Sequence, residues 1–405
     1  MSNNHSCRVH NLIFDPIPFK GGSKIATSEA LNQCNPDEVQ LTILTVDREY
    51  WQHSSLVQNH KVNIVTLTSI PWLSQQFCGL LYWVNQCYFT FILLLTLLRL
   101  PKVHHVIGAS GPGIDMSIYL AKALSDYSVV QLIHGNVACS RSIGWCLTKA
   151  NNVFYLPSAK PSITAALSHY IKDNTQIDDS ENLALHFLNS PAFQPFVNGI
   201  SSQNWPSKTT ARFPVCFWCA SLLKWKGLDV FIDSLRKIQF IQPVASTICY
   251  IQPKQTTLDM SVAPVNIAHT RWHHDPANLD AIRSQCNIFV STSHHEPFGL
   301  SILEALAAGM CVIIPRDGSY WDQKLRHNIH CIKYQAGDST SLSQAILSAY
   351  QNRKHLQNIQ AQGYKISQHY NAAQTYARIV NCVSVQYARS SEQAQNVVNT
   401  EGYNE

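Results

Sequence analysis

The chain has 405 residues, of which 45% are hydrophobic and only 14% are charged. One hydrophobic core rarely serves more than about 300 residues, so two domains of roughly 150 to 200 residues are expected, and the low charge argues against a largely disordered chain. The net charge of +5 is spread without a Lys/Arg run or a stretch that interleaves basic and aromatic residues, so we expect no nucleic-acid partner.

Short apolar runs alternate with helix-sized segments through the first half of the chain. The runs are RVHNLIF, VQLTILTV, VNIVTL, VHHVIGAS, VVQLIHG and NVFYLP. Such alternation is typical of a parallel sheet wrapped by helices. We therefore expect a Rossmann-like α/β domain over residues 1–197.

The stretch from Val62 to Leu98 contains no Asp, Glu, Lys, Arg or His. Its length would allow a transmembrane helix. Pro71 and several Ser, Gln and Asn residues interrupt it, however, and leave FTFILLLTLL as its strongly apolar run. This pattern favours a helix that is either buried or bound to a membrane surface.

A second series of apolar runs follows a stretch rich in Asn, Gly, Ser and Pro, FQPFVNGISSQNWPSKTTARF. The runs are VCFWCASLL, ASTICYIQP, VNIAHT, NIFVSTS, CVIIP and HCIKY. They predict a second Rossmann-like domain over residues 198–365, and residues 386–405 are expected to be a polar, disordered tail. Two doubly wound domains that face each other place the carboxyl ends of both sheets at one cleft, where we expect the site.

The thirteen cysteines are irregularly spaced and odd in number, and no secretory signal opens the chain, which favours a reducing cytoplasm. Cys216 and Cys219 lie three apart in a strand-like run and would face opposite sides of the sheet, which argues against a metal or redox pair. The sequence also contains no D-x-D and no histidine pair at zinc-site spacing. We therefore expect no metal and no cofactor.

Two acids, Glu296 and Glu304, lie in the segment HHEPFGLSILEALAAGM. The Pro-Phe-Gly turn places Glu296 in a loop at the carboxyl edge of the sheet, and the helical pattern after it places Glu304 on a buried stripe with Leu300 and Ala308. A buried carboxylate needs a partner, and an ionised acid can accept two sugar hydroxyls at once. A bond from Glu304 to neighbouring backbone, with Glu296 merely exposed, would serve equally well.

The same segment provides backbone amides at the positive end of the helix, which are free to hold a phosphate. They belong to Phe298, Gly299, Leu300 and Ser301.

The E-x7-E spacing in EPFGLSILEALAAG resembles the donor-site motif of the retaining family 4 glycosyltransferases, also called glycosyl transferases group 1, which have the two-lobed GT-B fold. Four further stretches resemble elements of that family in the same order along the chain. They are FKGGSKIATSEAL with the glycine-rich first loop, LIHGN with a histidine that faces the sugar, PFVNGI at the linker, and SLLKWKGLDVFIDSL with the loop that holds the donor pyrophosphate.

The resemblance implies retaining, metal-independent transfer from a UDP- or GDP-sugar to a glycan or lipid-linked glycan, in bacterial surface polysaccharide synthesis. Lys226 and Lys224 would hold the diphosphate, with Ser221 standing where the family has an arginine. Glu304 would accept the ribose hydroxyls, and Glu296 would lie near the transferred sugar. The resemblance implies three catalytic residues, Glu296, Lys226 and His134.

The resemblance also implies that residues 366–385 form a helix that returns to the first domain. Gly21 and Gly22 would let the first loop approach the donor or acceptor closely. Gly111, in GASGPGID, would lie in an acceptor-side loop, since the order G-x-x-G-x-G is the reverse of the dinucleotide fingerprint. The alternatives are a catalytically silent relative and a nicotinamide oxidoreductase. Peripheral membrane contact through Val62 to Leu98 stays open.

Overall fold

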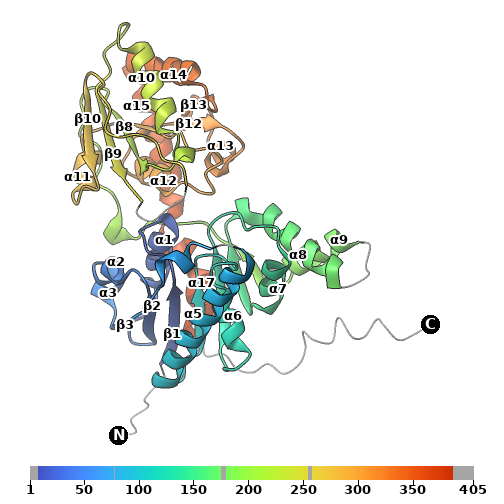
Figure 1. Ribbon diagram of the computed structural model, residues 1–405. Coiled ribbons are helices and arrows are strands. Elements are labelled where there is room, and N and C mark those ends of the chain that lie inside the picture. Colours follow the sequence, from blue (N-terminus) through green and yellow to red (C-terminus); the bar gives the residue numbers. More distant parts are fainter. Residues whose placement is uncertain (1–7, 77, 175–178, 254–257, 386–405) are drawn as a thin grey trace.

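The computed structural model describes residues 8–76, 78–174, 179–253 and 258–385. The expected disordered tail, residues 386–405, lies outside the described part of the chain. Figure 1 shows two α/β lobes, one built from the first half of the chain and one from the second. This two-domain arrangement of parallel sheets and helices confirms the fold class predicted from the alternation of apolar runs.

The first domain is built on a parallel seven-stranded sheet in the order β3-β2-β1-β4-β5-β6-β7. Its strands are β1 (Val9–Asp15), β2 (Val39–Thr45), β3 (Val62–Thr66), β4 (His105–Gly108), β5 (Ser128–Ile133), β6 (Asn152–Tyr155) and β7 (Phe193–Pro195). Its helices are α1 (Gly22–Leu31), α2 (Arg48–Gln52), α3 (Ser55–Asn59), α4 (Pro71–Ser74), α5 (Gly79–Arg99), α6 (Met116–Lys122), α7 (Arg141–Lys149), α8 (Lys160–Asn174) and α9 (Ser180–Leu188). The last strand, β7, lies at the start of the stretch rich in Asn, Gly, Ser and Pro, for which the sequence predicted no strand.

The core of the first domain follows the alternation of side chains along β1. All seven residues of β1 are buried. Leu12 and Phe14 pack on the side that α5 covers, whereas Ile13 packs on the side that α1 covers. A strand that is buried on both faces has apolar residues at consecutive positions. For this reason β1 could be predicted from the sequence.

The second domain contains a parallel six-stranded sheet in the order β10-β9-β8-β11-β12-β13. Its strands are β8 (Cys216–Ser221), β9 (Ser246–Ile251), β10 (Thr270–His274), β11 (Ile288–Val290), β12 (Cys311–Arg316) and β13 (Ile332–Gln335). Its helices are α10 (Leu228–Ile238), α11 (Leu279–Ser284), α12 (Leu300–Ala307), α13 (Tyr320–Lys324), α14 (Ser339–Gln351) and α15 (Arg353–Ser367). Cys216 and Cys219 contribute to the packing on opposite faces of this sheet, as expected.

One predicted strand of this domain is wrong. The run VNIAHT lies almost entirely before β10, which starts at its last residue and continues as TRWHH. Because β10 is an edge strand that is only half-buried, its side chains are polar and give no apolar run.

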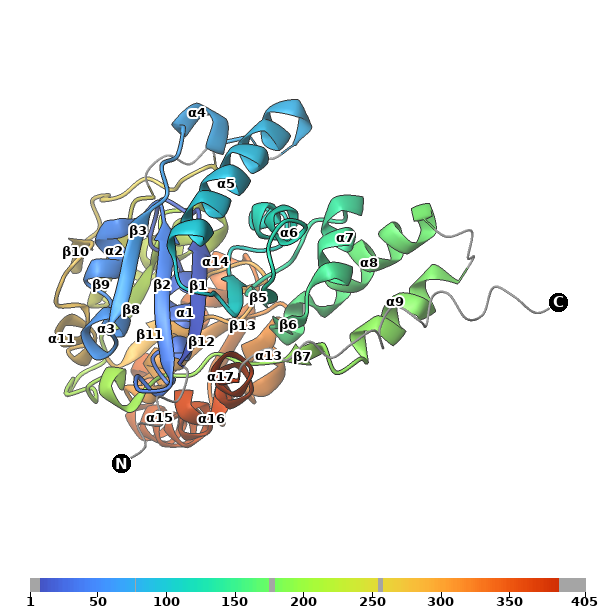
Figure 2. The same ribbon diagram turned by 90° about the horizontal axis from the view of Figure 1, so that it is seen from below.

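After α15 the chain returns to the first domain through α16 (Ala372–Thr375) and α17 (Ala377–Ser384). The Asn11 side chain in β1 donates a hydrogen bond to the Val383 carbonyl at 2.8 Å. The backbone of Ile200, in the linker, exchanges hydrogen bonds with Tyr370 and Ala372. Helices α16 and α17 contact α1, and α17 also contacts β1; Figure 2 shows them following α15.

Candidate active site

Loops from the two domains meet at the carboxyl ends of the two sheets. A Cβ atom added to Gly22, at the start of α1, would lie 3.9 Å from Leu300 Cδ1, at the start of α12. One added to Gly135, just after β5, would lie 3.5 Å from Pro297 Cγ. The glycine loops of the first domain therefore approach the segment of the second domain that carries the two predicted acids.

Lys226 and Glu296 form an ion pair beside this junction. The distance from Lys226 Nζ to Glu296 Oε2 is 2.5 Å, and the two side chains are only 18% and 17% exposed. The Lys226 ammonium also lies 3.9 Å from the centre of the Trp225 ring. Because the two loops come from different strands, β8 and β11, the pair joins them at the edge of the sheet.

The loop that carries Lys226 is held tightly against β11 and the residues after it. Gly227, which precedes α10, has φ of +72°, and a Cβ there would come within 2.2 Å of the Thr292 carbonyl oxygen. Thr292 Oγ1 donates to the Lys226 carbonyl at 2.8 Å, and the His294 amide donates to the Trp225 carbonyl at 2.9 Å. Glycine is therefore required at position 227 by its positive φ as well as by the close approach of Thr292.

Lys224 and Ser221 do not join this pair. Lys224 Nζ lies 2.8 Å from Asp229 Oδ2 on the surface, with 58% and 42% of the two side chains exposed. The hydrogen bond to Asp229 raises the pKa of Lys224. Ser221 is the last residue of β8 and is half-buried.

Glu304 is paired with Arg283, a residue that the sequence did not indicate. Arg283 Nη1 donates to Glu304 Oε2 at 2.8 Å, and Arg283 Nη2 lies 3.4 Å from Asp280 Oδ1. The Arg283 side chain is 9% exposed, whereas that of Glu304 is 32% exposed. Arg283 lies in α11 and belongs to no recognisable motif, so no signal in the sequence could have linked it to Glu304.

The predicted buried stripe is wrong for Glu304. Ala308 is buried, but Leu300, Ser301 and Glu304 form the half-exposed side of α12. This side is turned toward the first domain, because Leu300 lies next to Gly22. The Glu304 side chain is therefore partly accessible on this side of α12.

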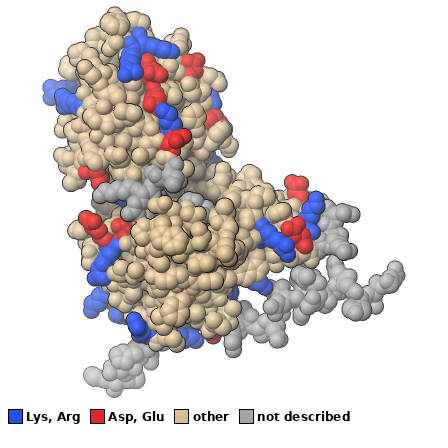
Figure 3. All heavy atoms as spheres, in the orientation of Figure 1, with Lys and Arg blue, Asp and Glu red and all other residues tan. Residues whose placement is uncertain are grey.

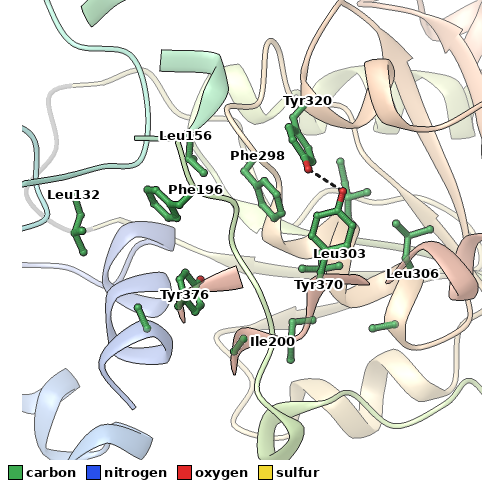
Figure 4. Close-up of a cluster of buried hydrophobic side chains, with 14 of the residues drawn as sticks. Leu132, Leu156, Phe196, Ile200, Phe298, Leu303, Leu306, Tyr320, Tyr370 and Tyr376 are labelled. Carbon is green, nitrogen blue, oxygen red and sulfur yellow. Dashed lines mark hydrogen bonds between the residues drawn. The ribbon is translucent and has the colours of Figure 1, made fainter. Parts of the chain in front are cut away.

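The N-terminus of α12 is shaped by Gly299 and anchored by an aromatic cluster. Gly299 has φ of +81° and precedes the helix, and its carbonyl accepts a hydrogen bond from Trp321 Nε1 at 3.1 Å. Phe298 is buried and packs against Tyr320, with 4.9 Å between ring centres. Figure 4 shows Phe298 beside Tyr320 and Tyr370 at the domain junction. The side chain of Phe298 thus contributes to packing.

The amides at this helix start remain available within the described part of the chain. The carbonyl of Gly299 accepts from the amides of Ile302 and Leu303, whereas those of Leu300 and Ser301 have no acceptor among the described residues. Such amides, with the helix dipole behind them, form a site for an anion.

His134 directly follows β5, on the opposite side of the junction. Its Nε2 lies 3.4 Å from Thr27 Oγ1, and its ring meets the Phe196 ring edge to face. Its Nδ1 is buried and has no hydrogen-bond partner among the described residues. Burial lowers the pKa of His134 to about 4, so the imidazole is neutral at pH 7.

A buried ion cluster fixes the glycine-rich first loop. Lys24 Nζ lies 3.0 Å from Asp15 Oδ2 and 2.8 Å from Asp47 Oδ2 and donates to the Ile17 carbonyl, and Lys24 is almost fully buried. This ties the start of α1 to the ends of β1 and β2. Gly21 faces open space, so its lack of a side chain leaves room at the cleft.

Gly111 lies in the loop between β4 and α6, at the same edge of the first sheet. It has φ of +100° and faces open space. Asp115 lies beneath this loop and accepts hydrogen bonds from the Ser110 amide and from Gln131 Nε2, both at 2.9 Å. Burial raises the pKa of Asp115 to about 7. The loop is therefore rigidly held where the sequence predicted an acceptor-side loop.

Positive charge gathers around the end of β8. Burial raises the pKa of Cys219 to about 12, and the charges of Glu304, Arg283, Lys20 and Lys226 also act on this thiol. Lys20, from the first loop, thus lies within electrostatic reach of the same point as the two cations of the second domain. Among the described residues, no group of three or more His, Cys, Asp and Glu side chains is placed to hold a metal ion.

A cavity of about 630 Å³ lies away from this junction, at the starting ends of β9 and β10. Its lining includes Ser246, Thr270, Arg271 and Gln285 but none of the predicted site residues. Ligands of parallel sheets bind at the carboxyl ends of the strands, so the junction between the domains is the better candidate.

Residues 203–366 match the family model of glycosyl transferases group 1. The match spans the sheet of the second domain. No curated protein matches the sequence of the chain. Among solved structures, Anabaena HepE in complex with UDP and glucose is similar with a TM-score of 0.66 and 16% identity, over 93% of this chain and 100% of HepE.

Two further structures show the same fold. Sucrose-phosphate synthase from Thermosynechococcus elongatus is similar with a TM-score of 0.65 and 13% identity, over 93% of this chain and 98% of the synthase. TarM is similar with a TM-score of 0.63 and 10% identity, over 95% of this chain and 100% of TarM. These likenesses confirm the predicted GT-B fold, and with the group 1 domain they support a GT-B glycosyltransferase.

Proposed function

We propose that the protein is a retaining glycosyltransferase of family 4 that transfers a sugar from a nucleotide diphosphate sugar to a glycan or lipid-linked glycan. One observation carries the proposal. The two acids of the E-x7-E motif are each paired with a cation, Lys226 or Arg283, on either side of the free amides of α12. These groups are of the kind that binds a sugar, a diphosphate and a ribose.

The diphosphate would bind to Lys226 and to the amides of Leu300 and Ser301. Breaking the bond between sugar and phosphate leaves about two negative charges on the nucleotide. Stabilising this leaving group should therefore be the largest contribution to lowering the activation free energy. In the free protein Lys226 is neutralised by Glu296. A bound diphosphate would compete for Lys226, because it offers two charges where Glu296 offers one.

Glu304 would accept the two ribose hydroxyls, since an ionised carboxylate accepts more than one hydrogen bond. Arg283 holds one of its oxygens, Oε2, and the other would accept from the ribose. Glu296, once released by Lys226, would lie near the transferred sugar and favour the partial positive charge of the ring. His134 is neutral, and its ring would have to turn the buried Nδ1 outward to bind a sugar hydroxyl from the other side.

The transfer would retain the configuration at the sugar carbon by attack on the face that the diphosphate leaves. The departing phosphate would take the proton of the acceptor hydroxyl. The cations and amides at the diphosphate position would neutralise its negative charge, as a divalent ion does in other enzymes. The reaction would then need neither a metal nor a cofactor. Gly21, Gly22 and Gly111 would leave room for the acceptor on the first domain.

The donor to test first is UDP-glucose, because HepE has been solved with UDP and with UDP-glucose. A GDP-sugar is the second choice. We place the protein in the bacterial cytoplasm, with peripheral contact at the inner face of the membrane, in surface polysaccharide synthesis.

The alternative is a catalytically silent relative that binds nucleotide sugars. Ser221 in place of the family's arginine, with Lys224 turned to Asp229, favours it. The test is a thermal-shift measurement against UDP, GDP, ADP and their sugars, together with slow hydrolysis of the sugar that binds. Binding with hydrolysis supports the enzyme, binding without turnover in the presence of acceptors supports the silent relative, and no binding to any nucleotide contradicts both.

A further inference from the structure

The helix α5 has the reverse of the usual pattern of a surface helix. Its exposed side consists of a strip of apolar residues spaced three or four apart: Leu80, Val84, Cys87, Phe91, Leu95 and Leu98. Its buried side includes the polar residues Asn85, Gln86 and Thr96. A helix that faces water carries its polar residues outside. The exposed face of α5 therefore differs from the face of a helix that is in contact with water.

The apolar face extends from α5 onto α4. Trp72 in α4 is 61% exposed, and on α5 Leu80 is 79% and Leu98 82% exposed. Figure 3 shows the face of the first domain over α5 as a broad area without Lys, Arg, Asp or Glu. Continuous exposed apolar areas of this kind mark a surface that another phase or molecule covers.

The fold excludes that α5 crosses a membrane, although it is the one helix of the described residues that is long and apolar enough. Gln86 Oε1 accepts a hydrogen bond from the Ser117 amide at 3.2 Å, and Tyr82 donates to the Gly113 carbonyl at 2.7 Å. Phe89 and Leu93 lie in the core. The helix is part of the domain and can only lie along a surface.

The charges around this face favour an anionic surface. Residues 50–114 contain no Asp or Glu, and their Lys and Arg residues are Lys61, Arg99 and Lys102. All three are exposed. Anionic lipid headgroups complement an apolar face that has the exposed cations Arg99 and Lys102 at the C-terminal end of its helix.

We propose that α4 and α5 form a membrane-docking surface that lies flat on an anionic phospholipid bilayer. Tyr82 links this surface to the loop that contains Gly111 and Gly113, on the acceptor side of the cleft. Docking would thus bring that side of the cleft to the lipid surface, where a lipid-linked acceptor lies. This last step rests on the proposed function, but the docking itself does not.

The test is flotation of the purified full chain, without donor, with vesicles of phosphatidylcholine alone or with about one-third phosphatidylglycerol. We expect binding to the anionic vesicles, and at least a tenfold loss of partitioning when Leu80→Glu and Phe91→Glu are combined. The matched control combines Phe240→Glu and Ile241→Glu, which replace apolar residues of the second domain that are 88% and 72% exposed. The control should bind as the unchanged protein does.

The cation contribution is tested with Arg99→Gln and Lys102→Gln together. Partitioning onto the anionic vesicles should fall roughly tenfold or more. The matched pair Lys160→Gln and Lys172→Gln, on α8, should change it little. Equal thermal stability of all variants excludes unfolding as the cause.

Two results would overturn the proposal. One is absence of binding to both kinds of vesicle. The other is a dimer in light scattering that the Leu80→Glu and Phe91→Glu pair makes monomeric, which would assign the face to a second copy of the chain. A protein that binds vesicles but neither binds nor hydrolyses nucleotide sugars would contradict the proposed function and leave the docking surface intact.

Discussion

The Lys226 ammonium and the Glu296 carboxylate are 2.5 Å apart, although the two residues come from loops that follow different strands. The pair is more than four-fifths buried on both sides. A partly buried pair of this kind restrains both loops and holds Lys226 at the place where a diphosphate would bind. A diphosphate that binds Lys226 would therefore also act on the loop that carries Glu296.

Replacing Lys226 with alanine should abolish most of the nucleotide-induced rise in melting temperature. Turnover of the nucleotide sugar should fall at least a hundredfold, because the charge opposite the leaving group is lost. Lys237→Ala is the matched control, since Lys237 lies at the far end of α10 and donates to Ser339 and Thr340. An unchanged shift in Lys226→Ala would falsify the assigned diphosphate position.

The pair Arg283–Glu304 should be detectable as a coupling free energy. Glu304→Gln should destabilise more than Arg283→Met, because it leaves a buried guanidinium with only Asp280 as an anionic partner. The coupling in a double-mutant cycle of urea unfolding should be about 1 to 2 kcal/mol, since the exposure of Glu304 weakens the pair. Both variants should also weaken nucleotide binding. Strictly additive effects on stability would show that the pair contributes nothing.

The fold could be predicted well wherever strands are buried on both faces. Strands such as β1 appear in the sequence as apolar runs, whereas the half-buried edge strand β10 does not. The apolar run VNIAHT, just before β10, therefore predicts a strand in the wrong place. The Pro-Phe-Gly turn predicted that Glu296 lies in a loop after a strand, but its ion pair with Lys226 was not predicted. The partner of Glu304 could not be predicted, because Arg283 is brought to it only by the packing of α11.

The apolar stretch around α5 shows a second limit of the sequence. Its periodicity predicted a helix but could not say which side would be buried. The structure turns the polar residues Asn85 and Gln86 inward, and Gln86 Oε1 accepts a hydrogen bond from the Ser117 amide in α6. Composition alone cannot predict such an inverted helix.

Tyr370→Phe should loosen the donor loop without unfolding the protein. The Tyr320 and Tyr370 hydroxyls are 2.8 Å apart and buried, and both rings pack on Phe298 in the donor loop. Removing one hydroxyl leaves the other unsatisfied, which should cost about 1 to 3 kcal/mol. Tyr364→Phe, in α15, is the control.

The measurements for Tyr370→Phe are urea unfolding and the affinity for the nucleotide. We expect a loss of stability accompanied by weaker binding, since Tyr370 also belongs to the segment that returns to the first domain. Loss of stability with unchanged binding would show that the aromatic cluster supports the core but does not position the loop.

Acid should destabilise the protein through histidines that are buried in the neutral form. Burial lowers the pKa of His10 and His105, and that of His134 to about 4. Because the folded-state pKa lies below the unfolded value of about 6.5, the unfolded chain binds more protons as the pH falls below 6.5. The stability is thus fully present above this pH and is lost progressively between about pH 6.5 and pH 4.

Unfolding in urea at pH 7.5 and pH 5 measures this loss, and replacement of one histidine assigns it. Between pH 7.5 and pH 5, His134→Gln should lose about 1 to 2 kcal/mol less of its free energy of unfolding than the unchanged protein does. The reason is that burial lowers the pKa of His134 to about 4. His186→Gln, in α9, should leave the pH dependence as it is in the unchanged protein. If His134→Gln leaves the slope unaltered, His134 is solvated in the folded protein and cannot be the neutral group that faces the sugar.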